Sequence, residues 1–519
     1  MNDKPKKPVP VAVIDVGSSF LRMLIGQIDA KGRIIVIDDL VKSTNIGRDT
    51  FSIGRVTADS IYETCDTIKG FAALMKDYHV RNYRAVATSG LRDAANKEYV
   101  LDQILNRTGI DVQIINTAQE RYYTFKALVV TCKNLPEMQQ EGLLLVNMGS
   151  GGLGITLYNS GKMKLREYFK IGSLRLWESL SEMEKTTPDF PKLMEEFLES
   201  QIYSVHERIL KEDPKHFVCL GGQLSQICAL CHSEGGNHSA PDVISRHALA
   251  IIVKKIEKMT IEQITSAFGL SRNDIETILP SIIILHKMLQ MSGAELIYAP
   301  TAALRQGILV DIGDKIMKSE KQKFFNEDIL NSVWYLGEKF GIDKKHCRKV
   351  FDISLAIFDA AKKMHGMGEN ERLLLMICAI MHDVGRFVNV NQHDIQGYSL
   401  MKSTEIMGFS NYEIELMANI VMYHSSTHPS PTDVNYAVLS EDDKILVSKL
   451  AAILKLAEAL DTTHKQRIRT VEVEKNGREL LIKVQTDDNI LLEEWNFKSA
   501  AVFFEEVMGY KPVFRKKGR

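Results

Sequence analysis

Short apolar runs separated by glycine- and serine-containing turns open the chain. Residues 9–16, 21–28 and 33–40 read as strands, because each is a strand-length, mostly apolar run bounded by turn residues. This pattern predicts an antiparallel meander. Beyond residue 60, helix-like periodicity at 60–76, 97–107 and 119–130 alternates with strand-like runs at 83–87 and 112–115. Such alternation is typical of βαβ units.

The opening pattern then recurs. A strand at 142–147, the turn Gly149-Ser150-Gly151-Gly152, and strands at 153–158 and 162–168 repeat the order of the opening, in which Gly17-Ser18-Ser19 is the turn. We infer two similar lobes that face a cleft, where each turn offers backbone N–H groups to a phosphate. Gly221-Gly222, after a third short apolar strand, is a further turn of this kind.

From about residue 315 the pattern changes to long helices with almost no strand signal. The expected helices are 327–340, 345–364, 370–380, 410–422 and 440–461. The charged stretch 315–323 is the predicted linker, residues 469–485 read as a hairpin about Asn476-Gly477, and a helix follows through 507. We expect the basic end, 515–519, to be a frayed tail. The predicted domains are therefore 1–135, 136–314, 315–465 and 466–519.

Composition narrows the possible partners. A chain of 519 residues exceeds the size of one ordinary core, which agrees with several domains. Sixty-five Lys and Arg balance 66 Asp and Glu, so no overall field attracts polyanions; we expect no DNA partner, and a phosphate ligand needs a local site. No apolar run is long enough to span a membrane, and seven cysteines do not make a disulfide framework, so we expect a cytoplasmic protein.

Histidines and aspartates in the helical half form the clearest candidate site. The ordered set is His346, His382, Asp383, His424 and Asp461. Imidazole and carboxylate ligands together suit a divalent ion such as Mg²⁺ or Mn²⁺ better than a structural thiolate zinc site. Such an ion lowers the pKa of a bound water and neutralises phosphoryl oxygens, as the hydrolysis of a phosphate ester requires.

Two resemblances follow from these motifs. Residues 325–465 resemble the HD superfamily of metal-dependent phosphohydrolases, whose metal ligands are matched by His346, His382, Asp383 and Asp461, with His424 as an occasional extra ligand. Residues 10–312 resemble the Ppx/GppA exopolyphosphatase and guanosine pentaphosphate phosphohydrolase family. The matching runs are Ala12-Val13-Ile14-Asp15-Val16-Gly17-Ser18-Ser19, Ala87-Thr88-Ser89-Gly90-Leu91-Arg92-Asp93-Ala94, Leu144-Leu145-Val146-Asn147-Met148-Gly149-Ser150-Gly151, Leu220-Gly221-Gly222 and Ala303-Leu304-Arg305-Gln306-Gly307-Ile308-Leu309.

The resemblance implies a fold class and a set of roles. The fold would be an α/β front half of two ribonuclease-H-like (actin-like) lobes, then an all-α HD-type domain and a small α+β C-terminal segment. Implied partners are polyphosphate or guanosine penta-/tetraphosphate, a divalent cation (Mg²⁺ or Mn²⁺), and a second copy in a homodimer. The candidate catalytic residues are Glu120, Asp15 and Arg92. The candidate phosphate-binding residues are Gly17, Ser18, Ser19, Gly149, Ser150, Gly151, Gly152, Gly221, Gly222 and Arg305.

Three positions depart from the family pattern. Asn147 stands where the family has an acidic residue that helps to hold the cation, and Gly154 aligns with a further Glu. Arg121 aligns with the catalytic Glu, next to the acidic Glu120. Since a positioned base contributes about 10²–10⁴ in rate, either Glu120 takes the role or the front half binds without hydrolysing.

Three functions are therefore open. The first is a Ppx/GppA-class phosphohydrolase that releases terminal phosphate from polyphosphate or guanosine pentaphosphate by cation-assisted attack of water. In the second, the front half senses a phosphate compound or nucleotide and the HD half hydrolyses a nucleotide. The third is a non-catalytic regulatory protein.

Overall fold

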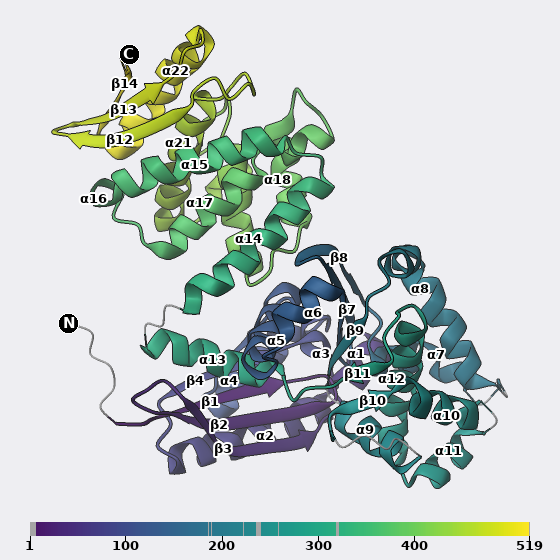
Figure 1. The fold of residues 1–519 in the computed structure, drawn as a ribbon. Coiled ribbons are helices and arrows are strands. Elements are labelled where there is room, and N and C mark those ends of the chain that lie inside the picture. The colour runs from purple at the N-terminus through teal and green to yellow at the C-terminus, as the bar shows by residue number, and fades with distance from the viewer. Residues whose placement is uncertain are drawn as a thin grey trace. The chain divides into compact units, whose positions relative to one another are not determined.

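The computed structural model describes residues 7–184, 186–187, 189–221, 223–234, 240–257, 259–317 and 321–517. It divides into two units, Met1–Gln322 and Lys323–Arg519, which are described in turn. Figure 1 labels most of their elements. Within the described residues, no helix combines the length and the apolarity needed to cross a bilayer.

Unit 1 contains two β-sheets. Its strands are β1 (Val9–Val16), β2 (Phe20–Ile28), β3 (Ile34–Ser43), β4 (Asn82–Ala87), β5 (Val112–Ile114), β6 (Leu143–Met148), β7 (Leu153–Asn159), β8 (Lys162–Phe169), β9 (His216–Gly221), β10 (Val243–Ser245) and β11 (Leu296–Tyr298). Its helices are α1 (Ile46–Ile53), α2 (Ala58–Asp77), α3 (Ser89–Arg92), α4 (Lys97–Thr108), α5 (Thr117–Thr131), α6 (Leu135–Glu141), α7 (Ser173–Leu180), α8 (Phe190–Glu212), α9 (Leu224–Ser233), α10 (Arg246–Ile256), α11 (Ile261–Phe268), α12 (Arg272–Gln290) and α13 (Leu304–Met317). These elements confirm an α/β front half.

The first sheet has the order β3-β2-β1-β4-β5. β1 pairs antiparallel with β2 and parallel with β4, so it is a central strand, and residues 11–16 are all buried. A strand buried on both faces reads as a continuous apolar run, which is why the sequence marked it so clearly. The predicted opening meander is confirmed.

The second sheet, β10-β11-β9-β6-β7-β8, repeats the arrangement. β6 pairs antiparallel with β7 and parallel with β9, as β1 does with β2 and β4. Each sheet therefore places a Gly/Ser turn after its central strand, and the repeat predicted from the sequence is present in the topology. Buried residues of α8, α10 and α12 pack against the second sheet in one core, in which Trp177 meets Phe190 edge to face at 5.3 Å.

Unit 2 begins with helices and ends in a small sheet. Its helices are α14 (Lys321–Lys339), α15 (Lys344–Ala360), α16 (Lys362–His365), α17 (Glu369–Met381), α18 (His393–Ser403), α19 (Asn411–Met422), α20 (Val434–Ala437), α21 (Glu441–Ala459) and α22 (Leu491–Met508). The strands β12 (Thr470–Asn476), β13 (Glu479–Gln485) and β14 (Lys511–Lys516) form one sheet in that order. The hairpin turns at Gly477, whose φ of 61° suits glycine.

Two details differ from the sequence-based expectation. The basic end is not frayed as far as residue 517: β14 pairs in parallel with β13, so Arg515 and Lys516 belong to the sheet. The stretch 315–323 is mostly helical, because α13 runs to Met317 and α14 begins at Lys321. The boundary between the units still falls within it.

Candidate functional site

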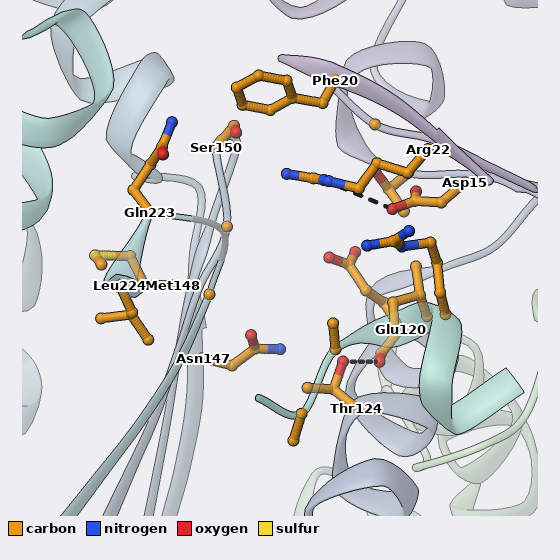
Figure 2. A pocket seen from close by; sticks show the side chains of 18 of the residues that line it. Asp15, Phe20, Arg22, Glu120, Thr124, Asn147, Met148, Ser150, Gln223 and Leu224 are labelled. Atoms are coloured by element: carbon orange, nitrogen blue, oxygen red, sulfur yellow. Dashed lines mark hydrogen bonds and ion pairs between the residues drawn. The ribbon is translucent and has the colours of Figure 1, made fainter. Parts of the chain in front are cut away.

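A cavity of about 670 Å³ lies in unit 1 between the two sheets' Gly/Ser turns. Figure 2 shows its two walls: Asp15, Arg22, Glu120 and Thr124 lie on one side, and Asn147, Met148, Ser150, Gln223 and Leu224 on the other. The first wall comes from β1, β2 and α5, and the second from β6, the turn after it and α9. The cavity is thus built where the two halves of the repeat meet.

The two turns close in the same way. Gly17 N donates to Phe20 O at 3.1 Å, and Gly149 N donates to Gly152 O at 2.9 Å. Ser19 Oγ donates to Ser150 Oγ at 2.9 Å, which brings the turns into direct contact. We call residues 17–19 loop one and residues 149–152 loop two.

Carbonyl oxygens of both loops accept hydrogen bonds from N–H groups of neighbouring backbone. Ser18 O and Ser19 O accept from Gly47 N and Thr44 N at 2.8 and 3.0 Å. Gly149 O and Ser150 O accept from Ser173 N and Arg175 N at 3.0 and 2.9 Å. Since these carbonyl oxygens already accept hydrogen bonds, the N–H groups of the loops are the polar backbone groups that suit an anion.

Loop two leaves no room for a side chain at Gly172, the residue before α7. A Cβ on Gly172 would lie 2.3 Å from both Gly149 O and Gly152 N. Because both contacts are backbone atoms, we expect Gly172→Ala to lower the free energy of unfolding of unit 1 by about 1–3 kcal/mol, measured by urea titration. Gly70→Ala in the interior of α2, where a Cβ meets nothing within 4 Å, should be neutral or stabilising. Equal midpoints for both variants would show that loop two accommodates the methyl group.

Glu120 is placed by the start of α5. A capping box fixes this start: Gln119 N donates to Asn116 Oδ1 at 2.8 Å, and Asn116 N donates to Gln119 Oε1 at 3.2 Å. Arg92 Nη1 donates to Glu120 Oε2 at 3.2 Å and to Ile115 O at 3.0 Å. Glu120 Oε1 lies 4.0 Å from the position of a Cβ on Gly149, so the carboxylate reaches loop two.

Asp15 is a buried carboxylate beside two arginines. Its Oδ2 lies 3.8 Å from Arg22 Nη1, across the register pair that joins β1 to β2, and its buried Oδ1 has no hydrogen-bond partner among the described residues. Burial raises the pKa of Asp15, and the charges of Arg22 and Arg305 oppose this shift. Arg305 is itself ion-paired with Asp39.

The structure gathers most of the predicted front-half residues in this cavity. Those that line it are Asp15, Gly17, Ser18, Ser19, Glu120, Gly149, Ser150, Gly152, Gly221 and Arg305. Gly151 instead packs against Ser89 and Phe51. Arg92 does not line the cavity but donates a hydrogen bond to Glu120, which does. Gly222 lies outside the described residues. The sequence reasoning missed Arg22, although the register of a β1–β2 hairpin places it opposite Asp15.

A second cluster lies in unit 2 and consists of buried histidines and carboxylates. His346 Nε2 lies 3.1 Å from His382 Nε2 and 2.9 Å from Glu458 Oε2, and His382 Nε2 lies 3.2 Å from the same oxygen. Asp383 places its oxygens 3.9 Å from His346 Nε2 and 4.0 Å from His393 Nε2. Among the described residues, three overlapping groups could hold an ion: His346 with His382 and Asp383, His346 with Glu458 and His464, and Asp383 with His393 and His424.

The electrostatics of this cluster favour a cation. Burial alone would lower the pKa of His346, but its hydrogen bonds with Asp461 and Glu458 outweigh burial and raise the pKa to about 10. Burial lowers the pKa of His424 to about 4, so its Nε2, which has no hydrogen-bond partner among the described residues, is a free lone pair. The buried carboxylates that favour a proton on His346 would equally favour a divalent ion.

Four of the five predicted ligands belong to these groups, and the fifth, Asp461, contacts His346. His346, His382, Asp383 and His424 each belong to one of the three groups, whereas Asp461 belongs to none. Its carboxylate accepts from His346 Nδ1 at 2.9 Å and from Gln466 N at 2.7 Å, so it orients the ring of His346 from behind. Glu458 and His464 were missed. Glu458 lies three residues before Asp461 at the end of the same helical segment, a spacing that marks one helix face.

Residues 24–316 match the model of the Ppx/GppA phosphatase family, and residues 330–499 match the model of Ppx/GppA phosphatase domain III. The chain belongs to the Ppx/GppA phosphatase family. The predicted resemblance of the front half is therefore confirmed, and the helical half is part of the same family architecture. Its assignment to the HD superfamily stays a prediction.

Individual relatives are distant. Exopolyphosphatase 1 of Mycobacterium tuberculosis is 19% identical over 309 residues, 58% of this chain and 87% of that protein. The bifunctional 3-dehydroquinate synthase/phosphatase of Fusobacterium nucleatum is 25% identical over 182 residues, and this match spans 34% of the chain but only 27% of that protein. An exopolyphosphatase structure from Cytophaga hutchinsonii covers 59% of this chain and 98% of its own at 19% identity and a TM-score of 0.52, which supports a shared fold.

Phosphatases of this family depend on divalent cations in general, and the two sites differ in how well they suit one. The cluster in unit 2 fits, because it combines buried imidazoles with carboxylate oxygens, of which Asp383 Oδ2 has no hydrogen-bond partner among the described residues. The front cavity does not fit. Asn147 and Gly154, which face each other across β6 and β7, supply no carboxylate. Asp15 has one oxygen beside Arg22 and one buried oxygen without a hydrogen-bond partner among the described residues, but it joins no group of three potential donors there.

Proposed function

We propose that the front cavity hydrolyses a terminal phosphoanhydride of inorganic polyphosphate or guanosine pentaphosphate, with Glu120 as the general base. The observation that carries this proposal is the position of Glu120, which Arg92 holds at 3.2 Å while its second oxygen reaches loop two. The similar proteins from Mycobacterium tuberculosis and Cytophaga hutchinsonii are exopolyphosphatases, which favours polyphosphate as the substrate class.

In this mechanism a water lies between Glu120 and the terminal phosphorus. Its oxygen forms a bond to phosphorus, Glu120 takes its proton, and the bond to the bridging oxygen breaks. Charge on the phosphoryl oxygens is met by backbone N–H groups of the two loops and by Arg22 and Arg305. The three side chains in this mechanism, Glu120, Arg22 and Arg305, all line one cavity.

A second site supports a second proposal, that unit 2 hydrolyses a nucleotide phosphate. His346, His382, Asp383, Glu458 and His424 would hold the ion, which when bound would activate a water and neutralise phosphoryl oxygens. The supporting observation is that Oδ2 of Asp383 and Nε2 of His424 are buried without a hydrogen-bond partner among the described residues, while Asp383 Oδ1 lies 2.7 Å from Arg386 Nε.

One assay separates the two proposals. Phosphate release from polyphosphate, guanosine pentaphosphate and simple nucleotides is measured for the wild type, Glu120→Gln and Asp383→Asn. If the front cavity is the catalytic site, we expect that Glu120→Gln alone abolishes phosphate release from polyphosphate. If Asp383→Asn alone abolishes it, the catalytic centre for polyphosphate lies in unit 2. If no sample releases phosphate, the regulatory alternative is favoured.

We expect the cluster in unit 2 to bind Mn²⁺ through Asp383. Asp383→Asn should weaken Mn²⁺ binding by more than about tenfold, because changes to groups that merely support a ligand already cost 10–100-fold. Isothermal titration of the full chain measures this. Asp359→Asn is the matched control, since Asp359 is half-exposed in the same unit and pairs with Arg372 outside the cluster. Equal Mn²⁺ affinity for both variants would remove Asp383 from the ligand set.

A further inference from the structure

The side chain of Arg121 occupies the part of the front cavity where carboxylates are missing. Arg121 follows Glu120 in the first turn of α5, lines the cavity and is half-buried. Its Cδ lies 3.4 Å from the position of a Cβ on Gly154. The stem of Arg121 therefore lies against Gly154, at van der Waals distance from where a side chain at this residue would begin.

The guanidinium of Arg121 lies beside Tyr168, a side chain that contacts loop two. It lies 5.7 Å from the ring centre of Tyr168, whose hydroxyl fills the space that a Cβ on Gly152 would need. Burial raises the pKa of Tyr168 to about 12, so the hydroxyl stays protonated and can donate. Across the strand pair, Asn147 adds an amide that can also donate. Loop two is thus bordered by donors and positive charge.

The carboxylates on the opposite wall are not arranged to bind one ion together. Asp15 lies beside Arg22, Asp39 pairs with Arg305, and Glu120 pairs with Arg92. A further carboxylate, Asp242, lines the cavity beside Cys228. Within the part of the chain that the structure describes, each group of three or more potential metal donors lies in unit 2.

We propose that the front cavity binds a phosphate chain with arginine side chains in place of a divalent cation, and that Arg121 neutralises the phosphate at loop two. A guanidinium carries permanent charge and presents a planar fork that matches phosphate oxygens. The inference rests on the proposed function only in taking a phosphate chain as the ligand, and it concerns binding and not turnover.

The test measures binding of inorganic triphosphate to the full chain by isothermal titration, in EDTA and in Mg²⁺. The wild type should bind in EDTA with an affinity within a few-fold of that in Mg²⁺. Arg121→Gln should weaken binding in EDTA by about ten- to a hundredfold, because it removes charge-assisted hydrogen bonds. Arg121→Lys should lose less, since it keeps the charge without the fork.

Controls keep the outcomes distinct. Arg107→Gln removes an exposed arginine of the same unit, which stacks on Tyr62, and should leave the affinity unchanged. Circular dichroism establishes that each variant is folded. If Arg121→Gln does not fold, Arg121→Lys alone is used for the test. Wild-type binding that disappears in EDTA overturns the inference, as does an Arg121→Gln affinity equal to that of the wild type. Failure of the proposed hydrolysis would appear separately, as binding without phosphate release.

Discussion

Glu120→Gln should lower kcat for phosphate release from polyphosphate by about 10²–10⁴-fold, because it removes the base that accepts the proton of the attacking water. Glutamine has the same shape and can still accept from Arg92 Nη1, so the start of α5 and loop two should stay in place. We therefore expect KM to change little. Initial rates of phosphate release across a range of polyphosphate concentrations separate the two constants.

The matched control for this prediction is Glu98→Gln. Glu98 lies in the first turn of α4, as Glu120 lies in the first turn of α5, but it is exposed and does not line the cavity. Its replacement should leave kcat and KM unchanged. If Glu120→Gln retains the wild-type kcat, Glu120 is not the base; if only KM rises, Glu120 contributes to binding alone.

Much of the fold could be predicted because central strands carry a strong local signal. β1 and β6 are apolar except at Asp15 and Asn147, and the Gly/Ser turns after them mark where each sheet changes direction. β14 could not be predicted in this way. Its sequence, Lys511–Lys516, is basic and contains Pro512, and it becomes a strand only because β13 offers a parallel partner. Pairing between segments distant in sequence leaves little trace in either segment.

Prediction from the local sequence is limited in the same way at the candidate sites. Motifs place Asp15, His382 and Asp383 correctly on strand and helix ends, but they do not determine which way a side chain points. Asp461 matches a ligand motif and instead binds the back of His346, while Glu458, one turn earlier, faces the histidines. In the front half, Arg121 and Glu120 are neighbours whose roles depend on helix phase, and the capping box at Asn116 sets that phase.

Lys126→Met should lower the free energy of unfolding of unit 1 by about 3–5 kcal/mol, since it removes the fully buried partner of the Asp311 carboxylate. Lys126 is fully buried, and its Nζ donates to Asp311 Oδ1 at 2.8 Å and lies 3.4 Å from Asp314 Oδ2. The interaction joins α5, which carries Glu120, to α13, which carries Arg305. Urea titration gives the free energy, and hydrogen exchange of α5 and α13 locates the loss.

A second lysine on the same carboxylate provides the control. Lys315 Nζ lies 3.0 Å from Asp311 Oδ2, but its side chain is 70% exposed, so Lys315→Met should cost only about 0–1 kcal/mol. Burial alone would raise the pKa of Asp311, but Lys126 and Lys315 outweigh it and lower the pKa. The stabilisation is therefore present above the unfolded value of about 3.9 and is lost as the pH falls through the folded value. Equal costs for the two variants would show that burial does not set the strength of this interaction.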